Sequence, residues 1–198
     1  MTRLYFLVSL LFISAVFSSA LNESPVSAEV LLAGKNSLPR TSVDRPSGYM
    51  AASPYYIIID KSDYELKVFD EEGWYATYPI VFGSKDQGDK LFEGDKRTPN
   101  GKYKIILKKV NPKWGAQMTL DYPTSANIQQ FNQRKAQGII PKNARIGNGI
   151  AIHSTRKSEE WTVDNFYNWT DGCISLKYSE MEDLFSYIPV GTEVTIQP

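Results

Sequence analysis

The chain contains one cysteine and one histidine, Cys173 and His153, which lie 20 residues apart. A cysteine thiolate is a strong nucleophile, and a neighbouring imidazole is the group that usually generates it. The pair could serve as nucleophile and general base, provided that the residues between them fold back. Each residue also has an ordinary structural role, because a lone cysteine is often a small core residue. Their types and spacing leave both interpretations open.

The residues around Cys173 bear on this choice. Gly172 precedes it, and glycine lets a substrate or a strained turn approach the backbone closely. The backbone N–H groups of Gly172 and Cys173 could form an oxyanion hole. A zinc site would need three or four ligands, and no carboxylate stands at ligand spacing from His153 and Cys173. We therefore expect no metal.

Short strands must position these side chains. Aromatic, β-branched or alternating runs predict strands over residues 55–60, 65–69, 74–82, 102–110, 150–153 and 192–196. His153 then stands where a strand ends, and residues 158–168 supply the return as a short helix or lid. The polar segment 83–100 is long for a loop in a compact domain, and such loops are often functional.

Two helices are predicted with definite starting points. The first is capped by Thr124 or Ser125, runs to Gln137 and buries Ile128 and Phe131. The second begins at a capping box over Ser179–Glu182. The fold class that follows is mainly β with two or three helices.

The first 20 residues predict export. Arg3 supplies a positive charge, residues 4–17 are mostly apolar, and Ser18-Ser19-Ala20 offers small residues for cleavage, as in a secretory signal peptide. Cleavage after Ala28 is the alternative. The apolar stretch is shorter than the roughly 20 residues of a membrane-spanning helix. We therefore expect transfer across the inner membrane, with no stable membrane insertion after cleavage.

The remainder divides into an arm and one domain. Residues 21–52 are rich in Ser, Pro, Ala, Gly and Asn, which predicts a linker or disordered arm before a folded domain over 53–198. The whole chain carries 22 basic and 22 acidic residues. Because binding of nucleic acid needs a clustered basic face, we expect no nucleic-acid partner.

Three sequence blocks together resemble one known family. They are Ile152-His153-Ser154, Thr170-Asp171-Gly172-Cys173-Ile174 and the upstream segment Gly94–Tyr103, which reads Gly-Asp-Lys-Arg-Thr-Pro-Asn-Gly-Lys-Tyr. Residues 120–123 and 146–147 also fit. The pattern is similar to the catalytic domain of the L,D-transpeptidases, the YkuD-type enzymes of bacterial peptidoglycan. The resemblance covers residue 54 to the C-terminus.

The resemblance implies a β-sandwich-type catalytic domain, no cofactor and definite roles for several residues. Cys173 would be the nucleophile and His153 the general acid and base. Gly172 and Cys173 would supply the oxyanion-hole amides, while Thr170 and Asp171 would shape the loop. Two further residues, Ser154 and Tyr122, would be candidates for the substrate cleft.

The resemblance also implies the reaction. Cys173 attacks the carbonyl of the third residue of a peptidoglycan stem peptide, and D-alanine leaves. The acyl group passes to an amine of a second stem, to an amine of a wall-anchored protein, or to water, in the periplasm or cell wall. Transfer to water would make the protein an L,D-carboxypeptidase, a hydrolase of the same fold. The chain could instead be a non-catalytic wall-binding module or a secreted structural β-domain.

Two positions depart from the commonest family pattern. Asp171 stands where many members carry His, and Ser175 stands where many carry Arg or Asn. The first change replaces a potential cation by an acid beside the nucleophile. We expect it to affect the recognition of substrate and not the presence of activity.

Overall fold

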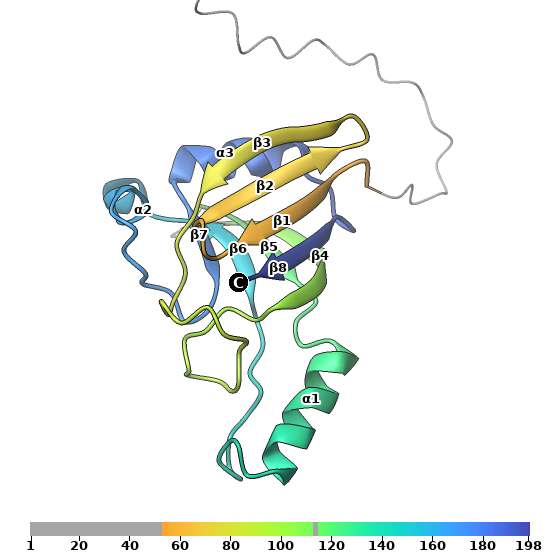
Figure 1. The fold of residues 1–198 in the computed structure, drawn as a ribbon. Helices are drawn as coiled ribbons and strands as arrows, with labels where there is room; N and C mark the ends of the chain where they lie inside the picture. Colours follow the sequence, from red (N-terminus) through yellow and green to blue (C-terminus); the bar gives the residue numbers. More distant parts are fainter. Residues whose placement is uncertain (1–52, 113–114) are drawn as a thin grey trace, which may run out of the picture. The chain divides into compact units, whose positions relative to one another are not determined.

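The computed structural model describes residues 53–112 and 115–198, so the predicted signal peptide and the arm over 21–52 lie outside the described residues. Eight strands form a sheet in the order β3-β2-β1-β8-β4-β5-β6-β7 (Figure 1). They are β1 (Tyr56–Asp60), β2 (Glu65–Asp70), β3 (Gly73–Pro79), β4 (Gly101–Asn111), β5 (Gly115–Leu120), β6 (Ala151–Ser154), β7 (Ile174–Leu176) and β8 (Glu193–Gln197).

The described ranges also hold the α-helices α1 (Ser125–Ala136), α2 (Trp161–Asp164) and α3 (Tyr178–Tyr187), with a 3-10 turn, η1, over Lys157–Glu159. The predicted class, mainly β with two or three helices, is confirmed. The predicted return between His153 and Cys173 is built from η1 and α2.

The long strand β4 joins two halves of the sheet. Its first residues, Gly101 to Lys104, pair with β8, and its later residues pair with β5. The register of the β4–β5 pair shifts between Ile105 and Leu107, where the partner of β4 changes. Beyond β3, Val81 forms a bridge with Ser175 of β7. The segment that follows β3 is therefore paired with β7, the last strand in the sheet order.

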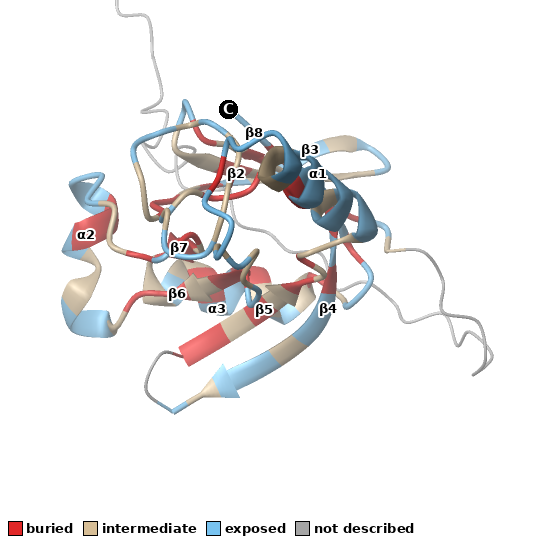
Figure 2. Ribbon diagram, turned by 90° about the horizontal axis from the view of Figure 1, so that it is seen from below, coloured by how far each residue is buried: buried red, intermediate tan, exposed pale blue. Residues whose placement is uncertain are grey.

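The apolar core explains why these strands form. In β1, Ile57 and Ile59 are buried while their neighbours are exposed or intermediate, as expected for a strand with one buried face. All three residues of β7 are buried, and Figure 2 shows buried residues along the strands that meet in the core. The strand that follows Cys173 thus lies inside the protein, which fixes the position of the site.

The two predicted helices differ from expectation in detail. Thr124 caps α1, and its side chain accepts from the Asn127 N–H, as predicted for that position. Phe131 is buried, but Ile128 is 45% exposed, so the prediction that Ile128 is buried is wrong. Figure 1 shows α1 standing apart from the sheet, so only part of its surface is covered.

The capping box predicted for α3 is also wrong. The helix begins at Tyr178, which places Ser179 inside the first turn, and Lys177 at the N-cap makes no side-chain capping bond. The Tyr178 N–H instead donates to the Glu160 carboxylate at 3.0 Å. The Glu160 carboxylate, between η1 and α2, therefore satisfies one backbone N–H at the start of α3.

Strand β5 is not covered by any of the predicted strands. It pairs with both β4 and β6.

Candidate active site

Parallel strands β6 and β7 carry the two residues that could perform chemistry. Their register pairs His153 with Ser175. Cys173 lies two residues before Ser175, and alternate residues of an extended chain face the same side. Cys173 and His153 are therefore diagonal neighbours on one face of the β6–β7 pair. The β6–β7 register thus brings the segments that carry the predicted nucleophile and the predicted base side by side.

The Cys173 thiol is partly buried beside β6. Its Sγ lies 3.6 Å from the carbonyl oxygen of Gly149. Burial raises the pKa of the thiol; a hydrogen bond from the Ala151 backbone and the charge of Lys90 oppose this rise, and Asp171 adds to it. The resting sulfur therefore carries its proton and needs a base to become a nucleophile.

The His153 ring is held in one tautomer. Its Nδ1 lies 3.0 Å from the Ser154 carbonyl oxygen, and a carbonyl can only accept, so Nδ1 carries the hydrogen and Nε2 has a free lone pair. The Trp169 ring meets the imidazole edge-on with 5.5 Å between centroids. Burial lowers the pKa of the imidazole, and the Ser154 bond partly opposes this shift. The ring is thus a neutral base that presents Nε2.

The loop that leads into Cys173 is fixed by one hydroxyl and one glycine. The Thr170 hydroxyl donates to the Cys173 carbonyl at 2.7 Å and accepts from the Gly172 N–H at 3.2 Å. Gly172 has φ +123°, and a Cβ there would lie 2.7 Å from the Arg97 carbonyl oxygen. Thr170 therefore shapes the loop, whereas Asp171 is exposed. The Gly172 N–H would have to leave Thr170 to bind an oxyanion.

The polar segment 83–100, here called the 83–100 loop, packs against the loop of Cys173. A Cβ on Gly83 would lie 2.3 Å from the Lys96 carbonyl oxygen and 2.4 Å from that of Thr170. The Thr170 N–H also donates to the Phe82 carbonyl at 3.2 Å. The two loops touch through their backbones, so a displacement of one displaces the other.

A buried lysine, Lys61, binds backbone carbonyls of the 83–100 loop. Lys61 is only 1% exposed. Its Nζ donates to the Gly88 and Thr98 carbonyls at 3.3 and 3.4 Å, and also to the Gln87 carbonyl. Burial lowers the pKa of Lys61 from an ordinary 10.5 to about 8, although Asp89 and Asp86 oppose the shift. Its ammonium group binds the loop at Gln87 and Gly88 and again at Thr98.

Two ion pairs also hold the 83–100 loop in place. The Lys90 Nζ lies 2.7 Å from the Asp95 carboxylate, and these side chains are 4% and 7% exposed. Arg134 of α1 pairs with Asp89 of the loop at 2.8 Å. Sequence analysis did not identify Lys61 or Lys90 as part of the site, because a lysine is normally solvated. The only sequence pattern that pointed to this ion pair was the Gly-Asp-x-x-Thr-Pro segment, which contains Asp95.

The two predicted substrate-cleft residues lie elsewhere. Ser154 is fully buried and, by alternation along β6, faces away from the side that carries His153. A Cβ on Gly115 would lie 2.6 Å from its Oγ, which shows how closely β5 covers it. The Tyr122 hydroxyl donates to the Ile146 carbonyl at 3.2 Å, and the residue is 7% exposed. Both side chains are engaged inside the protein.

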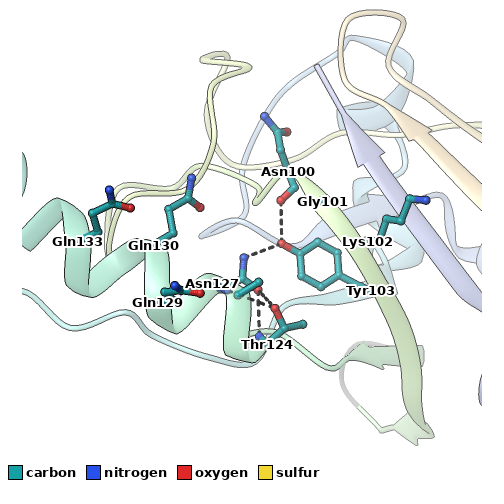
Figure 3. Close-up of a pocket in the computed structure, with 10 residues that line it drawn as sticks. Asn100, Gly101, Lys102, Tyr103, Thr124, Asn127, Gln129, Gln130 and Gln133 are labelled. Carbon is teal, nitrogen blue, oxygen red and sulfur yellow. Dashed lines mark hydrogen bonds between the residues drawn. The ribbon is translucent and has the colours of Figure 1, made fainter.

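A groove of about 480 Å³ opens between the start of β4 and the first turns of α1. Figure 3 shows the Tyr103 hydroxyl at its base, where it donates to the Asn100 carbonyl and accepts from the Asn127 amide. The other lining residues are Gly101, Lys102, Thr124, Ala126, Gln129, Gln130 and Gln133. None of the residues predicted to act in catalysis lines this groove, so the candidate site is a separate surface.

Within residues 53–112 and 115–198, no cluster of three or more His, Cys, Asp or Glu side chains is arranged to hold a metal ion. Over the same ranges, no helix is both long and apolar enough to cross a bilayer.

Comparison with known proteins agrees with the predicted family. A family model described as the L,D-transpeptidase catalytic domain, YkuD, matches residues 54–196. The protein named "Putative L,D-transpeptidase YqjB" of Bacillus subtilis (strain 168) is 28% identical over 145 residues, which are 71% of this chain and 70% of that protein.

Solved structures confirm the fold. Pgp2, described as the helical cell shape determining protein of Campylobacter jejuni, aligns with a TM-score of 0.54 and 25% identity, over 75% of this chain and 49% of that one. Bd1075 of Bdellovibrio bacteriovorus aligns with a TM-score of 0.53 and 23% identity, over 75% of this chain and 48% of that one. The present chain thus spans about half the length of these two proteins.

Proposed function

The chain belongs to the YkuD family of L,D-transpeptidase catalytic domains, and we propose that it is a cysteine-dependent L,D-transpeptidase that acts on peptidoglycan stem peptides. The observation that supports this proposal is the β6–β7 register, which pairs His153 with Ser175, two residues after Cys173. The Ser154 carbonyl supports it, because it directs the free nitrogen of the imidazole away from its own backbone.

The first half of the reaction forms the acyl-enzyme. His153 Nε2 takes the thiol proton as the sulfur attacks the carbonyl of the third stem residue, because the resting pair is neutral on both sides. The carbonyl electrons move to the oxygen, which the Cys173 backbone amide and a released Gly172 amide would stabilise. Collapse of this intermediate breaks the peptide bond, and D-alanine leaves with the proton from His153.

The second half transfers the acyl group. An amine of a second stem attacks the thioester carbon, His153 takes a proton from the amine, and the sulfur leaves and recovers a proton from His153. An amine on a wall-anchored protein would follow the same steps. Water as the acceptor would yield the L,D-carboxypeptidase reaction, which is the alternative within this fold. No step requires a cofactor.

The proposed location follows from the first 20 residues and the proposed substrate. We propose that the mature protein lacks residues 1–20 and acts in the periplasm or cell wall, where peptidoglycan is found. Sequencing the N-terminus of the protein recovered from fractionated cells tests this proposal. Residue 21 or 29 at the N-terminus supports export, and retained Met1 on cytosolic protein contradicts it.

The activity is tested with purified tetrapeptide muropeptides and mass spectrometry of the products. Release of D-alanine with formation of cross-linked dimers supports the transpeptidase, and tripeptide products alone support the carboxypeptidase. Cys173→Ala should reduce either product to background, whereas Ser158→Ala, at an exposed position, should not. Full activity in Cys173→Ala would overturn the proposal, and wall binding without turnover would favour the non-catalytic module.

A further inference from the structure

The Lys90–Asp95 ion pair is buried where the 83–100 loop meets the loop of Cys173, and the reaction described above does not use it. Asp95 is already well satisfied without a cation, because it accepts from the Leu91, Phe92 and Arg97 N–H groups at 2.6, 3.2 and 3.0 Å. Burying two opposite charges is a poor source of stability, since both lose their hydration. The presence of a buried lysine here therefore calls for another reason.

The position of the ammonium group supplies one. Lys90 Nζ donates to the Arg97 carbonyl at 3.3 Å. The same carbonyl lies against Gly172, where an added Cβ would come within 2.7 Å of its oxygen. One backbone carbonyl thus separates the ammonium group from the residue that precedes Cys173. With 4% of its side chain exposed, Lys90 is poorly screened by water, so its field reaches further than that of a surface lysine.

The charged groups around the sulfur come from three elements. His153 lies on the neighbouring strand β6 and is neutral at rest, because burial lowers the pKa of its imidazole. Asp171, on the loop of Cys173 itself, raises the pKa of the thiol, while Lys90, on the 83–100 loop, lowers it. The Arg97 guanidinium, which lies nearby in sequence, is paired with Asp86. Lys90 therefore supplies the positive charge that favours a thiolate.

We propose that Lys90 is an electrostatic partner of Cys173, stabilising negative charge on the sulfur while the proton passes to His153 Nε2, and that the Asp95 carboxylate partly neutralises the lysine charge, while the Arg97 carbonyl also binds the ammonium group. The proposal rests on Cys173 being the nucleophile. It assigns a role to a residue outside the sequence blocks that contain Cys173 and His153.

The test uses the pH dependence of alkylation of Cys173 by iodoacetamide, which needs no peptidoglycan and reports thiolate directly. Lys90→Met removes the charge and keeps the aliphatic stem, so the apparent pKa of the thiol should rise by about one unit, which slows alkylation at a fixed lower pH about tenfold. Asp95→Asn removes the negative charge and leaves the lysine, so the apparent pKa should fall. Lys90→Arg, which keeps the charge, should stay close to wild type.

The opposite signs separate this role from a structural one. If the pair served only to hold the loop, Lys90→Met and Asp95→Asn would disturb the site in the same direction. Shifts of the same sign, or an unchanged profile in folded Lys90→Met, would overturn the proposal. If Lys90→Met does not fold, the double variant Lys90→Met/Asp95→Asn leaves no unpaired charge and decides the matter: its thiol pKa should be raised, and an unchanged pKa overturns the proposal.

The proposal and the enzymatic function can fail separately. Cys173→Ala should show no specific alkylation, which sets the background. An unshifted Lys90→Met profile in a protein whose Cys173 is essential for turnover would overturn only the role of Lys90. Turnover that persists in Cys173→Ala would overturn the function, whatever the alkylation profiles show.

Discussion

The two loops that meet at Cys173 are held by different forces. The loop of Cys173 is short, and neutral contacts fix it: the Thr170 hydroxyl bridges it, and Gly172 allows close packing. The 83–100 loop is long, and charged groups fix it: Lys61 binds three of its carbonyls, and Lys90 pairs with Asp95. The first loop presents the reacting atom, and the second determines where the first loop lies and what charge surrounds it.

This difference predicts which substitutions affect chemistry and which affect structure. Changes of Cys173 and His153 should alter rate without much loss of stability, because both residues are only partly buried. Changes where the two loops touch should alter stability first, because backbone lies against backbone there.

The largest expected effect on rate is that of His153→Gln. Glutamine keeps a polar side chain of similar reach but cannot accept and return a proton near neutral pH. We expect kcat/KM to fall by at least about 100-fold, the usual scale for loss of a general base, with a melting temperature close to wild type. A rate within a fewfold of wild type, measured on muropeptide turnover, would show that His153 does not serve as the base.

The next effect concerns the contact between the loops. A Cβ at Gly83 would lie 2.3 and 2.4 Å from two backbone oxygens, so Gly83→Ala should lower the free energy of unfolding by about 2 kcal/mol or more. Gly88→Ala, in the same loop, is the matched control, because its Cβ would meet the end of the Asp86 side chain at 2.8 Å. That side chain can move, so the control should lose less than about 1 kcal/mol. Equal losses in urea denaturation would contradict the proposed tight backbone contact.

Lys61→Met tests the charged support through pH. The folded protein lowers the pKa of Lys61 from 10.5 to about 8, so between these values the unfolded chain binds the proton more tightly than the folded one. The stability contributed by this group therefore rises as pH increases from 8 to 10.5 and is lost again as pH falls back to 8. The difference in unfolding free energy between wild type and Lys61→Met should change in wild type's favour over that range. A pH-independent difference would show that Lys61 is not buried as described.

The smallest expected effect lies far from both loops. Ile128 of α1 is 45% exposed, so Ile128→Ala should change the free energy of unfolding by less than about 0.5 kcal/mol, as for most surface positions. A loss above about 2 kcal/mol in urea denaturation would indicate that this face of α1 is covered, as the sequence pattern suggested.

The sequence predicts the elements whose signals are local. A β-branched and aromatic run located β1, alternating residues located β2, and Thr124 located the start of α1, because these signals depend on neighbours in the chain. The exposure of Ile128 could not be predicted, since it depends on where α1 leaves the sheet. Strand β5 was missed because its place is fixed by pairing with β4 and β6. Strand β4 directly precedes it, but β6 follows only after α1 and a long connection.

The same contrast holds within the site. Cys173 and His153 were identified because their residue types carry chemistry and the family resemblance joins them. Lys61 and Lys90 were not, because burial of a lysine is decided by tertiary packing and contradicts the usual preference of that residue for solvent. Ser154 was assigned to the substrate cleft by the family resemblance, but strand alternation turns its side chain to the face of β6 opposite His153.

The proposed mechanism requires Cys173 to form an acyl-enzyme. A carbapenem offers a strained amide that an acylating thiolate should open, and by resemblance to the family it is the most suitable probe. Intact-protein mass spectrometry after incubation with imipenem or meropenem should show one added molecule per chain, absent in Cys173→Ala and formed more slowly as pH falls below the coupled titration of Cys173 and His153. The adduct should persist if the enzyme transfers to amines and clear within minutes if it admits water. No adduct on folded wild-type protein after prolonged excess, or an equal adduct on Cys173→Ala, would contradict the claim.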